Sequence, residues 1–170
     1  MARSNTLRPD ALRRLALAAA LCLAWPVAAQ DAPAADGAAA DPPGFDAALA
    51  AELGADEYGM RRYVLVILKT GPTPMPKGEA RDAMFRGHFA NMQRLADEGK
   101  LVVAGPLDGV EGRRGIFILD AADLDEARAL VATDPVIAHG EMVAELHAWY
   151  GSAALRQVHA THARIARRSP

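Results

Sequence analysis

The alternation of apolar and polar residues changes in character near Arg61, where a sparse N-terminal region gives way to dense hydrophobic runs. Residues 63–68 are a continuous β-branched apolar run, which is typical of a buried central strand. Between residues 80 and 98 the apolar positions recur three and four apart, which predicts an amphipathic helix closed by a glycine. His88 falls on this apolar stripe, so its polar ring is expected to face the core and to need a hydrogen-bond partner there.

Later apolar segments predict three more strands and two more helices. The expected strands are 101–104, 115–119 and 142–149. Asp123 is a good N-cap for a helix that Asp134-Pro135 interrupts, and a final helix is expected over 153–166. The order strand, helix, strand, strand, helix, strand is that of the α+β ferredoxin-like βαββαβ fold, in which both helices cover one face of an antiparallel sheet.

The second face of such a sheet has no cover of its own. Because the predicted strands are strongly apolar, an open face would leave a large hydrophobic patch on a monomer. We therefore expect a homodimer in which two sheets pack face to face, with the C-terminal helix helping to cover an edge.

The N-terminus has the three-part layout of a secretory signal peptide: arginines, an apolar run from Leu15 to Trp25, and the small residues of 27–29. This predicts a signal peptide over 1–29 and a periplasmic or secreted protein. The apolar run is shorter than the ~20 residues of a stable membrane span, although a retained anchor is the alternative. Arg13-Arg14 leaves twin-arginine export open beside general secretion.

Composition divides the rest of the chain into three parts. Residues 30–57 are rich in Ala, Asp, Pro and Gly, and we expect a disordered tether there. Within it, 46–53 could form a helical turn or two, although the sequence shows no surface for it to pack against. Residues 58–150 carry the strands and helices of one folded domain, and 151–170 form a C-terminal helix and tail.

Charge and cysteine usage narrow the function classes. The formal net charge is −2, and since residues 1–29 carry four Arg and one Asp, the remainder is near −5. That acidic balance argues against nucleic-acid binding. The single cysteine, Cys22, lies in the predicted signal peptide, so the exported chain would hold neither a disulfide nor a thiol nucleophile.

His88 and Asp134 are the candidate pair for chemistry. Asp134 stands where the second helix turns toward the last strand, and both helices lie on one face, so its carboxylate can reach an inward-facing imidazole. The carboxylate would fix the imidazole tautomer and favour its protonated form, leaving the other ring nitrogen to exchange a proton with a ligand. The alternative is a core histidine with a purely structural partner.

An ordered set of short motifs resembles the YCII-related (YciI-like) family over about 61–149. These motifs are Gly87-His88, Gly99-Lys100-Leu101, Ala104-Gly105-Pro106-Leu107 and Asp134-Pro135. The resemblance implies a dimeric α/β-barrel arrangement of ferredoxin-like subunits and a His–Asp dyad at His88 and Asp134. It also implies that Gly105 and Pro106 lie beside the dyad, where we expect them to contact a substrate.

The resulting hypothesis is an exported enzyme that uses this dyad for acid/base catalysis, of isomerase or lyase type, on a small organic acid or lactone. No metal and no cofactor are expected. The alternative is a non-catalytic small-molecule-binding or scaffold module that uses the same dimeric pocket. Its motivation is the tether and the appended helix, which a free-standing enzyme does not need.

Other polar residues remain open to more than one interpretation. Arg113 and Arg114 flank a predicted turn and could attract a carboxylate, although turn arginines are usually solvated. His159 and His162 share one side of the last predicted helix, but no third metal ligand is in register with them.

Overall fold

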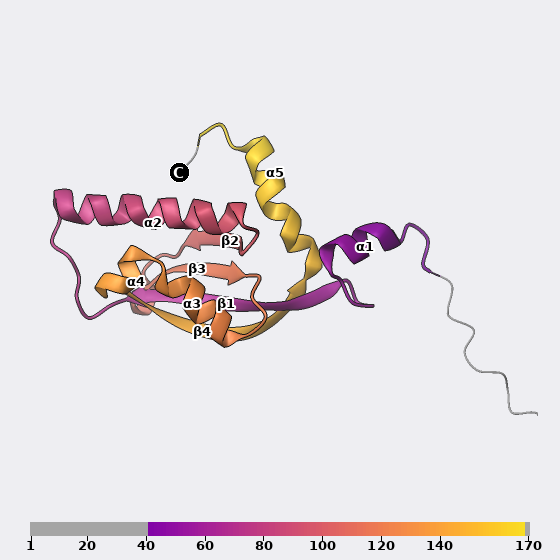
Figure 1. Ribbon diagram of the computed structural model, residues 1–170, viewed down its shortest axis with the longest axis horizontal. Helices are drawn as coiled ribbons and strands as arrows, with labels where there is room; N and C mark the ends of the chain where they lie inside the picture. Colours follow the sequence, from indigo (N-terminus) through magenta and orange to yellow (C-terminus); the bar gives the residue numbers. More distant parts are fainter. Residues whose placement is uncertain (1–40, 169–170) are drawn as a thin grey trace, which may run out of the picture. The chain divides into compact units, whose positions relative to one another are not determined.

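The central strand β1 forms because its β-branched residues have a partner strand on each side. In the computed structural model, which describes residues 41–168, the four strands are β1 (Met60–Thr70), β2 (Leu101–Pro106), β3 (Arg113–Leu119) and β4 (Met142–Ser152). All neighbouring pairs are antiparallel and the strand order is β2-β3-β1-β4 (Figure 1). The predicted signal peptide lies outside the described residues.

Three helices connect the strands: the two that the sequence predicts and a short one after Pro135, where only a break is expected. They are α2 (Glu79–Asp97), α3 (Leu124–Ala132) and α4 (Pro135–His139). The second crossover is divided between α3 and α4 because Pro135 cannot continue α3 and instead occupies the first turn of α4. The element order and the sheet order together are those of the ferredoxin-like fold, so the predicted fold class is confirmed.

The main core lies between the sheet and these helices. Alternate residues of β1 point toward the helices, and Val64, Val66 and Leu68 are each 3% exposed or less. The helices and neighbouring strands supply the rest of the cluster: Met84, Leu95, Leu101, Phe117, Leu119, Ala121, Ala127, Val131, Val136 and Met142.

The opposite face of the sheet is covered only at one end. There the 3₁₀ helix η2 (Ala153–Gln157) places Leu155 against a small cluster of Tyr63, Val102 and Ile118. Away from η2, apolar side chains of this face remain accessible, and Val143 is 42% exposed. We call this surface the open face; its residues on β1, β3 and β4 include Leu65, Ile67, Ile116, Val143 and Trp149.

The segments that flank the domain are ordered where the structure describes them. Helix α1 (Ala47–Leu53) lies inside the expected tether 30–57, and residues 30–40 of that tether fall outside the described residues. Asp46 caps α1 by accepting a hydrogen bond from the amide of Leu49, and Leu53 is buried. The alanine-rich composition that favours disorder in isolation thus also permits a short helix once a cap and a contact exist.

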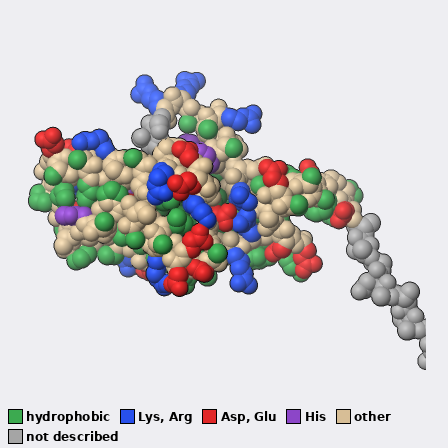
Figure 2. All heavy atoms as spheres, in the orientation of Figure 1, with side chains coloured by type: hydrophobic (Ala, Val, Ile, Leu, Met, Phe, Trp, Pro, Cys, Tyr) green, Lys and Arg blue, Asp and Glu red, His purple; other side chains and the backbone are tan. Residues whose placement is uncertain are grey.

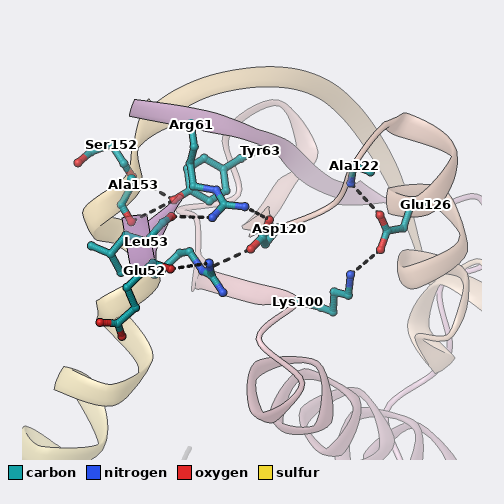
Figure 3. A network of polar contacts seen from close by, with 11 residues as sticks. Glu52, Leu53, Arg61, Tyr63, Lys100, Asp120, Ala122, Glu126, Ser152 and Ala153 are labelled. Atoms are coloured by element: carbon teal, nitrogen blue, oxygen red, sulfur yellow. Dashed lines mark hydrogen bonds and ion pairs between the residues drawn. The ribbon is translucent and has the colours of Figure 1, made fainter. Parts of the chain in front are cut away.

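Asp120, at the end of β3, joins both flanking segments to the domain (Figure 3). Its two oxygens lie 2.7 Å from Nη2 of Arg61 and 3.5 Å from Nε of Arg156. Arg61 also donates to the carbonyl of Leu53 at 2.7 Å, and Arg156 donates to that of Glu52 at 3.4 Å. The two arginines therefore hold the C-terminal end of α1 beside η2.

The C-terminal segment is divided where the sequence predicts one continuous helix over 153–166. Ser152 accepts a hydrogen bond from the amide of Ala154 and starts η2, and α5 (Val158–Ile165) follows. Among residues 41–168, none of the helices combines the length and the hydrophobicity that crossing a lipid bilayer requires.

Candidate active site

His88 and Asp134 form a direct hydrogen bond in the core. Nδ1 of His88 lies 2.7 Å from Oδ2 of Asp134, and the two residues are 7% and 1% exposed. An ionised carboxylate can only accept hydrogen bonds, so Nδ1 carries the proton and donates it. The neutral imidazole therefore has its lone pair on Nε2, which is the nitrogen that can act as a base.

Three phenylalanines surround the imidazole. Its ring centroid is 5.3 Å from that of Phe89, 6.0 Å from Phe85 in an edge-to-face arrangement, and 6.2 Å from Phe117 in a stacked one. Helix α2 supplies two of these rings and β3 supplies the third. The apolar walls fix the ring plane and lower the local dielectric, which strengthens the interaction with Asp134.

Asp134 is held by the start of α4. Its second oxygen, Oδ1, accepts a hydrogen bond from the amide of Val136 at 3.1 Å, which makes Asp134 the N-cap of α4. The neighbouring Pro135 packs against Gly87 of α2 so closely that a Cβ added at Gly87 would lie 3.0 Å from its Cγ. The Gly87-His88 and Asp134-Pro135 motifs thus meet in space, and the glycine lets α2 and α4 approach.

Nε2 of His88 is available to a ligand. It makes no hydrogen bond within residues 41–168, where Nε of Arg61 is the one fully buried side-chain polar atom that lacks a partner. The imidazole side chain retains 9% of its surface. The arrangement therefore combines a fixed Nδ1 with an accessible, uncommitted Nε2, as a general acid/base needs.

Gly105 and Pro106, the expected substrate contacts, lie on opposite faces of the sheet. Gly105 is paired with Ile116 of the open face, whereas Pro106 is paired with Gly115 on the helix-covered face. His88 stacks on Phe117, which is paired with Ala104. The structure therefore places Pro106 on the same face as the dyad, two residues further along β2, and turns Gly105 away from it.

Comparison with known proteins assigns the chain to a family. The sequence profile of the YCII-related domain matches residues 62–149, just over half of the chain. The chain belongs to the YCII-related family. The matched residues run from β1 to the end of the predicted fourth strand, so α1, η2 and α5 are additions to the YCII-related domain.

One solved structure among those that match is 5-chloro-2-hydroxyhydroquinone dehydrochlorinase from Burkholderia phenoliruptrix AC1100, in complex with 2,5-dihydroxybenzoquinone. The two sequences are 21% identical, the alignment covers 51% of this chain and 92% of that one, and the TM-score is 0.37. No curated protein sequence matches the chain.

A second buried carboxylate, Glu141, lies at the end of the YCII-related domain where β1 finishes and β4 begins. Its Oε1 is 2.9 Å from Nη2 of Arg81 and 3.9 Å from Nη1 of Arg114, and its Oε2 accepts the amide hydrogen of Met75 at 2.5 Å. The sequence indicates Arg114 as a group that could attract a carboxylate, but not its neighbours Arg81 and Glu141. One indication of Arg81 is present in the sequence. Arg81 stands four residues before Phe85 and seven before His88, so the three side chains share one face of α2.

The surroundings of Glu141 favour its charged form. Burial alone would raise the pKa of its carboxyl, but the Met75 amide and the guanidinium groups of Arg81 and Arg114 outweigh burial and lower that pKa. A folded-state pKa below the unfolded one stabilises the protein above the unfolded pKa, and this contribution is lost as the pH falls through the folded value.

We therefore expect Glu141→Gln to lower the free energy of unfolding at pH 7, and the difference from wild type to shrink as the pH falls below about 4.5. Urea unfolding at pH 7, 5 and 3.5 measures it. Glu57→Gln, on an exposed turn, is the control and should be neutral throughout. A difference that stays constant from pH 7 to 3.5 would contradict a charged Glu141.

The charged groups at the other end of the sheet pair with one another. A recess of 1340 Å³ lies at the end of the sheet that holds Asp120, where Lys100 pairs with Glu126 at 2.6 Å and Arg61 with Asp120. Acidic and basic side chains lie next to one another across the centre of the face in Figure 2. Because the charges that line it pair with one another, we place the candidate site at the dyad and not in this recess.

The remaining histidines are dispersed. His159 approaches Asp97 at 3.6 Å, and His147 hydrogen-bonds Glu145 at 2.8 Å on the open face. Within the part of the chain that the structure describes, no three His, Cys, Asp or Glu side chains are grouped in a way that could hold a metal ion.

Proposed function

We propose that this YCII-related protein is an exported acid/base enzyme in which His88, oriented by Asp134, moves a proton on a small organic acid or lactone. The observation that carries the proposal is the buried 2.7 Å contact between Nδ1 and Oδ2, which leaves Nε2 without a protein partner among the described residues. Export is supported by the signal-peptide pattern of residues 1–29.

The chemistry requires only one proton-carrying group. Nε2 removes a proton from a carbon next to a carbonyl, and the electron pair of the broken C–H bond moves into the carbonyl to give an enolate. Asp134 stabilises the imidazolium that forms. Where a C=C bond of the substrate is conjugated with this enolate, return of the proton to the far carbon of the resulting dienolate moves the double bond and completes an isomerisation. Alternatively, the enolate expels a leaving group with its electron pair from the adjacent carbon, and the imidazolium releases its proton to solvent.

A screen in deuterium oxide tests the proposal without knowledge of the natural substrate. The protein is incubated with small lactones and oxo acids, and ¹H NMR follows loss of carbon-bound hydrogen or conversion to a product. We expect at least one compound class to exchange or react far faster than in buffer alone. Compounds that bind, as judged by a raised melting temperature, and remain chemically unchanged would favour the non-catalytic binding module.

We further propose that the active form is a homodimer that packs open face to open face. The support is the accessible apolar side chains of this face, such as Ile67 and Val143, which lie beside the exposed Lys69–Glu145 ion pair, together with cover from η2 at only one end. Ile67→Glu is expected to convert the dimer into a monomer in analytical ultracentrifugation, because it buries a charge in that interface. Ile165→Glu, on a residue that is 74% exposed on α5, should leave the mass unchanged. A monomeric wild-type protein at micromolar concentration would contradict the dimer.

A further inference from the structure

We infer that Arg81 and Arg114 form an anchor for the carboxylate of the ligand on which His88 acts. This inference rests on the proposed role of His88 and adds the substrate class: a small carboxylic acid whose reacting carbon lies a few bonds from its carboxylate. Neither arginine belongs to the predicted dyad.

The two guanidinium groups carry more charge than their partner neutralises. Glu141 is 2% exposed and is the one carboxylate within 4.0 Å of Arg81 and Arg114 in residues 41–168, so the cluster keeps one positive charge in excess. Arg81 and Arg114 are themselves 25% and 30% exposed. Excess positive charge that is partly shielded from water attracts an anion more strongly than a solvated arginine does.

Unused donors remain on both arginines. A guanidinium carries five N–H groups. Arg81 donates one hydrogen bond to Glu141, and the side chain of Arg114 donates none to any residue from 41 to 168; its 3.9 Å contact with Glu141 is an ion pair only. A carboxylate could therefore accept hydrogen bonds from either guanidinium without breaking the contact that Arg81 makes with Glu141.

Arg81 lies close enough to the dyad for one small molecule to reach both. Its guanidinium carbon is 4.4 Å from the ring centroid of Phe85, and that centroid is 6.0 Å from the imidazole of His88. The two distances limit the separation of guanidinium and imidazole to about 10 Å. With a hydrogen bond of about 3 Å at each end, at most about 4 Å remains, which is no more than roughly three covalent bonds.

The strand beneath this path connects the two groups. From Phe117, under the imidazole, β3 continues through Gly115 to Arg114, and β2 packs so closely here that a Cβ added at Gly115 would lie 2.9 Å from the carbonyl oxygen of Gly105. Pro106, which is paired with Gly115, lies beside the same path. This arrangement gives Pro106 a position next to a bound ligand.

Levulinate, a 4-oxo acid, and its uncharged methyl ester are the probes, and NMR titration of the full-length protein measures their dissociation constants. Levulinate is expected to bind more tightly than the ester. Arg81→Gln should weaken levulinate binding at least about tenfold and leave ester binding unchanged. Arg86→Gln, an exposed arginine on the same helix, is the matched control and should change neither.

Two further variants separate an anchor from a structural role. Arg114→Gln should weaken levulinate binding less than Arg81→Gln does. Glu141→Gln removes the competing carboxylate and should tighten levulinate binding, which a purely structural cluster would not do. Equal binding of levulinate and its ester to wild type, unchanged binding in Arg81→Gln, or no levulinate binding at all would overturn the anchor.

The experiments can refute the anchor without refuting the proposed acid/base role, and the acid/base role without refuting the anchor. Binding is measured without turnover, so His88→Gln should still bind levulinate if the anchor is right, whether or not the wild type exchanges any hydrogen. Conversely, exchange that needs His88 and is indifferent to Arg81→Gln would leave the acid/base role intact and remove the anchor.

Discussion

Replacement of His88 by glutamine is expected to slow proton exchange on a reactive lactone or oxo acid by about 10²–10⁴-fold, the usual contribution of a positioned acid/base group. Glutamine is similar in size and can still donate a hydrogen bond to Asp134, but it has no nitrogen that accepts and returns a proton at neutral pH. The loss should therefore appear in the rate constant of exchange, measured by ¹H NMR in deuterium oxide.

His159→Gln is the matched control, because His159 also pairs with an aspartate, Asp97, on the surface at 3.6 Å. It should exchange at the wild-type rate. Circular dichroism and the melting temperature of both variants check the fold. A folded His88→Gln protein that exchanges hydrogen as fast as wild type would exclude His88 as the catalytic group.

Asp134→Ala is expected to lower the free energy of unfolding by about 2–4 kcal/mol. The N-cap of α4 contributes about 1 kcal/mol, and a buried imidazole N–H left without its partner costs about 1–3 kcal/mol. Asp134 is 1% exposed, so water cannot replace the lost carboxylate without rearrangement. Urea unfolding at pH 7 measures the difference.

Two comparisons identify the source of this loss. Asp123→Ala removes an exposed N-cap, that of α3, and should cost only about 1 kcal/mol. Asp134→Asn keeps an oxygen for the amide of Val136 and should be milder than Asp134→Ala. It should nevertheless slow exchange, since an amide that donates to Nδ1 moves the imidazole proton to Nε2. Equal losses for Asp123→Ala and Asp134→Ala would mean that the buried contact with His88 stabilises nothing.

The sequence was sufficient for the fold and for the pairing of the dyad, for identifiable reasons. The apolar run of 63–68 and the apolar stripe around His88 are local sequence patterns. Each is sufficient to indicate the type of element, strand or helix, and the face that it buries. Asp134-Pro135 marks a helix boundary wherever it occurs, so its position at the end of the second crossover could be inferred before the contact with His88 was seen.

What escaped the sequence depends on long-range geometry. Arg81 and Glu141 are 60 residues apart, and nothing near either residue indicates the other. The face of Gly105 depends on strand register, which shifts between Leu101 and Val103, and an irregularity of one residue reverses every later side chain. Helix α1 depends on contacts of Arg61 and Leu53 that its alanine-rich composition does not reveal.

Chemical rescue of His88→Ala tests the acid/base role most directly. Free imidazole can enter the space that the side chain vacates and supply the missing nitrogen, whereas in His88→Gln that space stays filled. The account predicts that hydrogen exchange in His88→Ala rises with imidazole concentration and that His88→Gln does not respond. Exchange at the wild-type rate in His88→Ala without imidazole, or no recovery in a variant that still binds the compound, would contradict it.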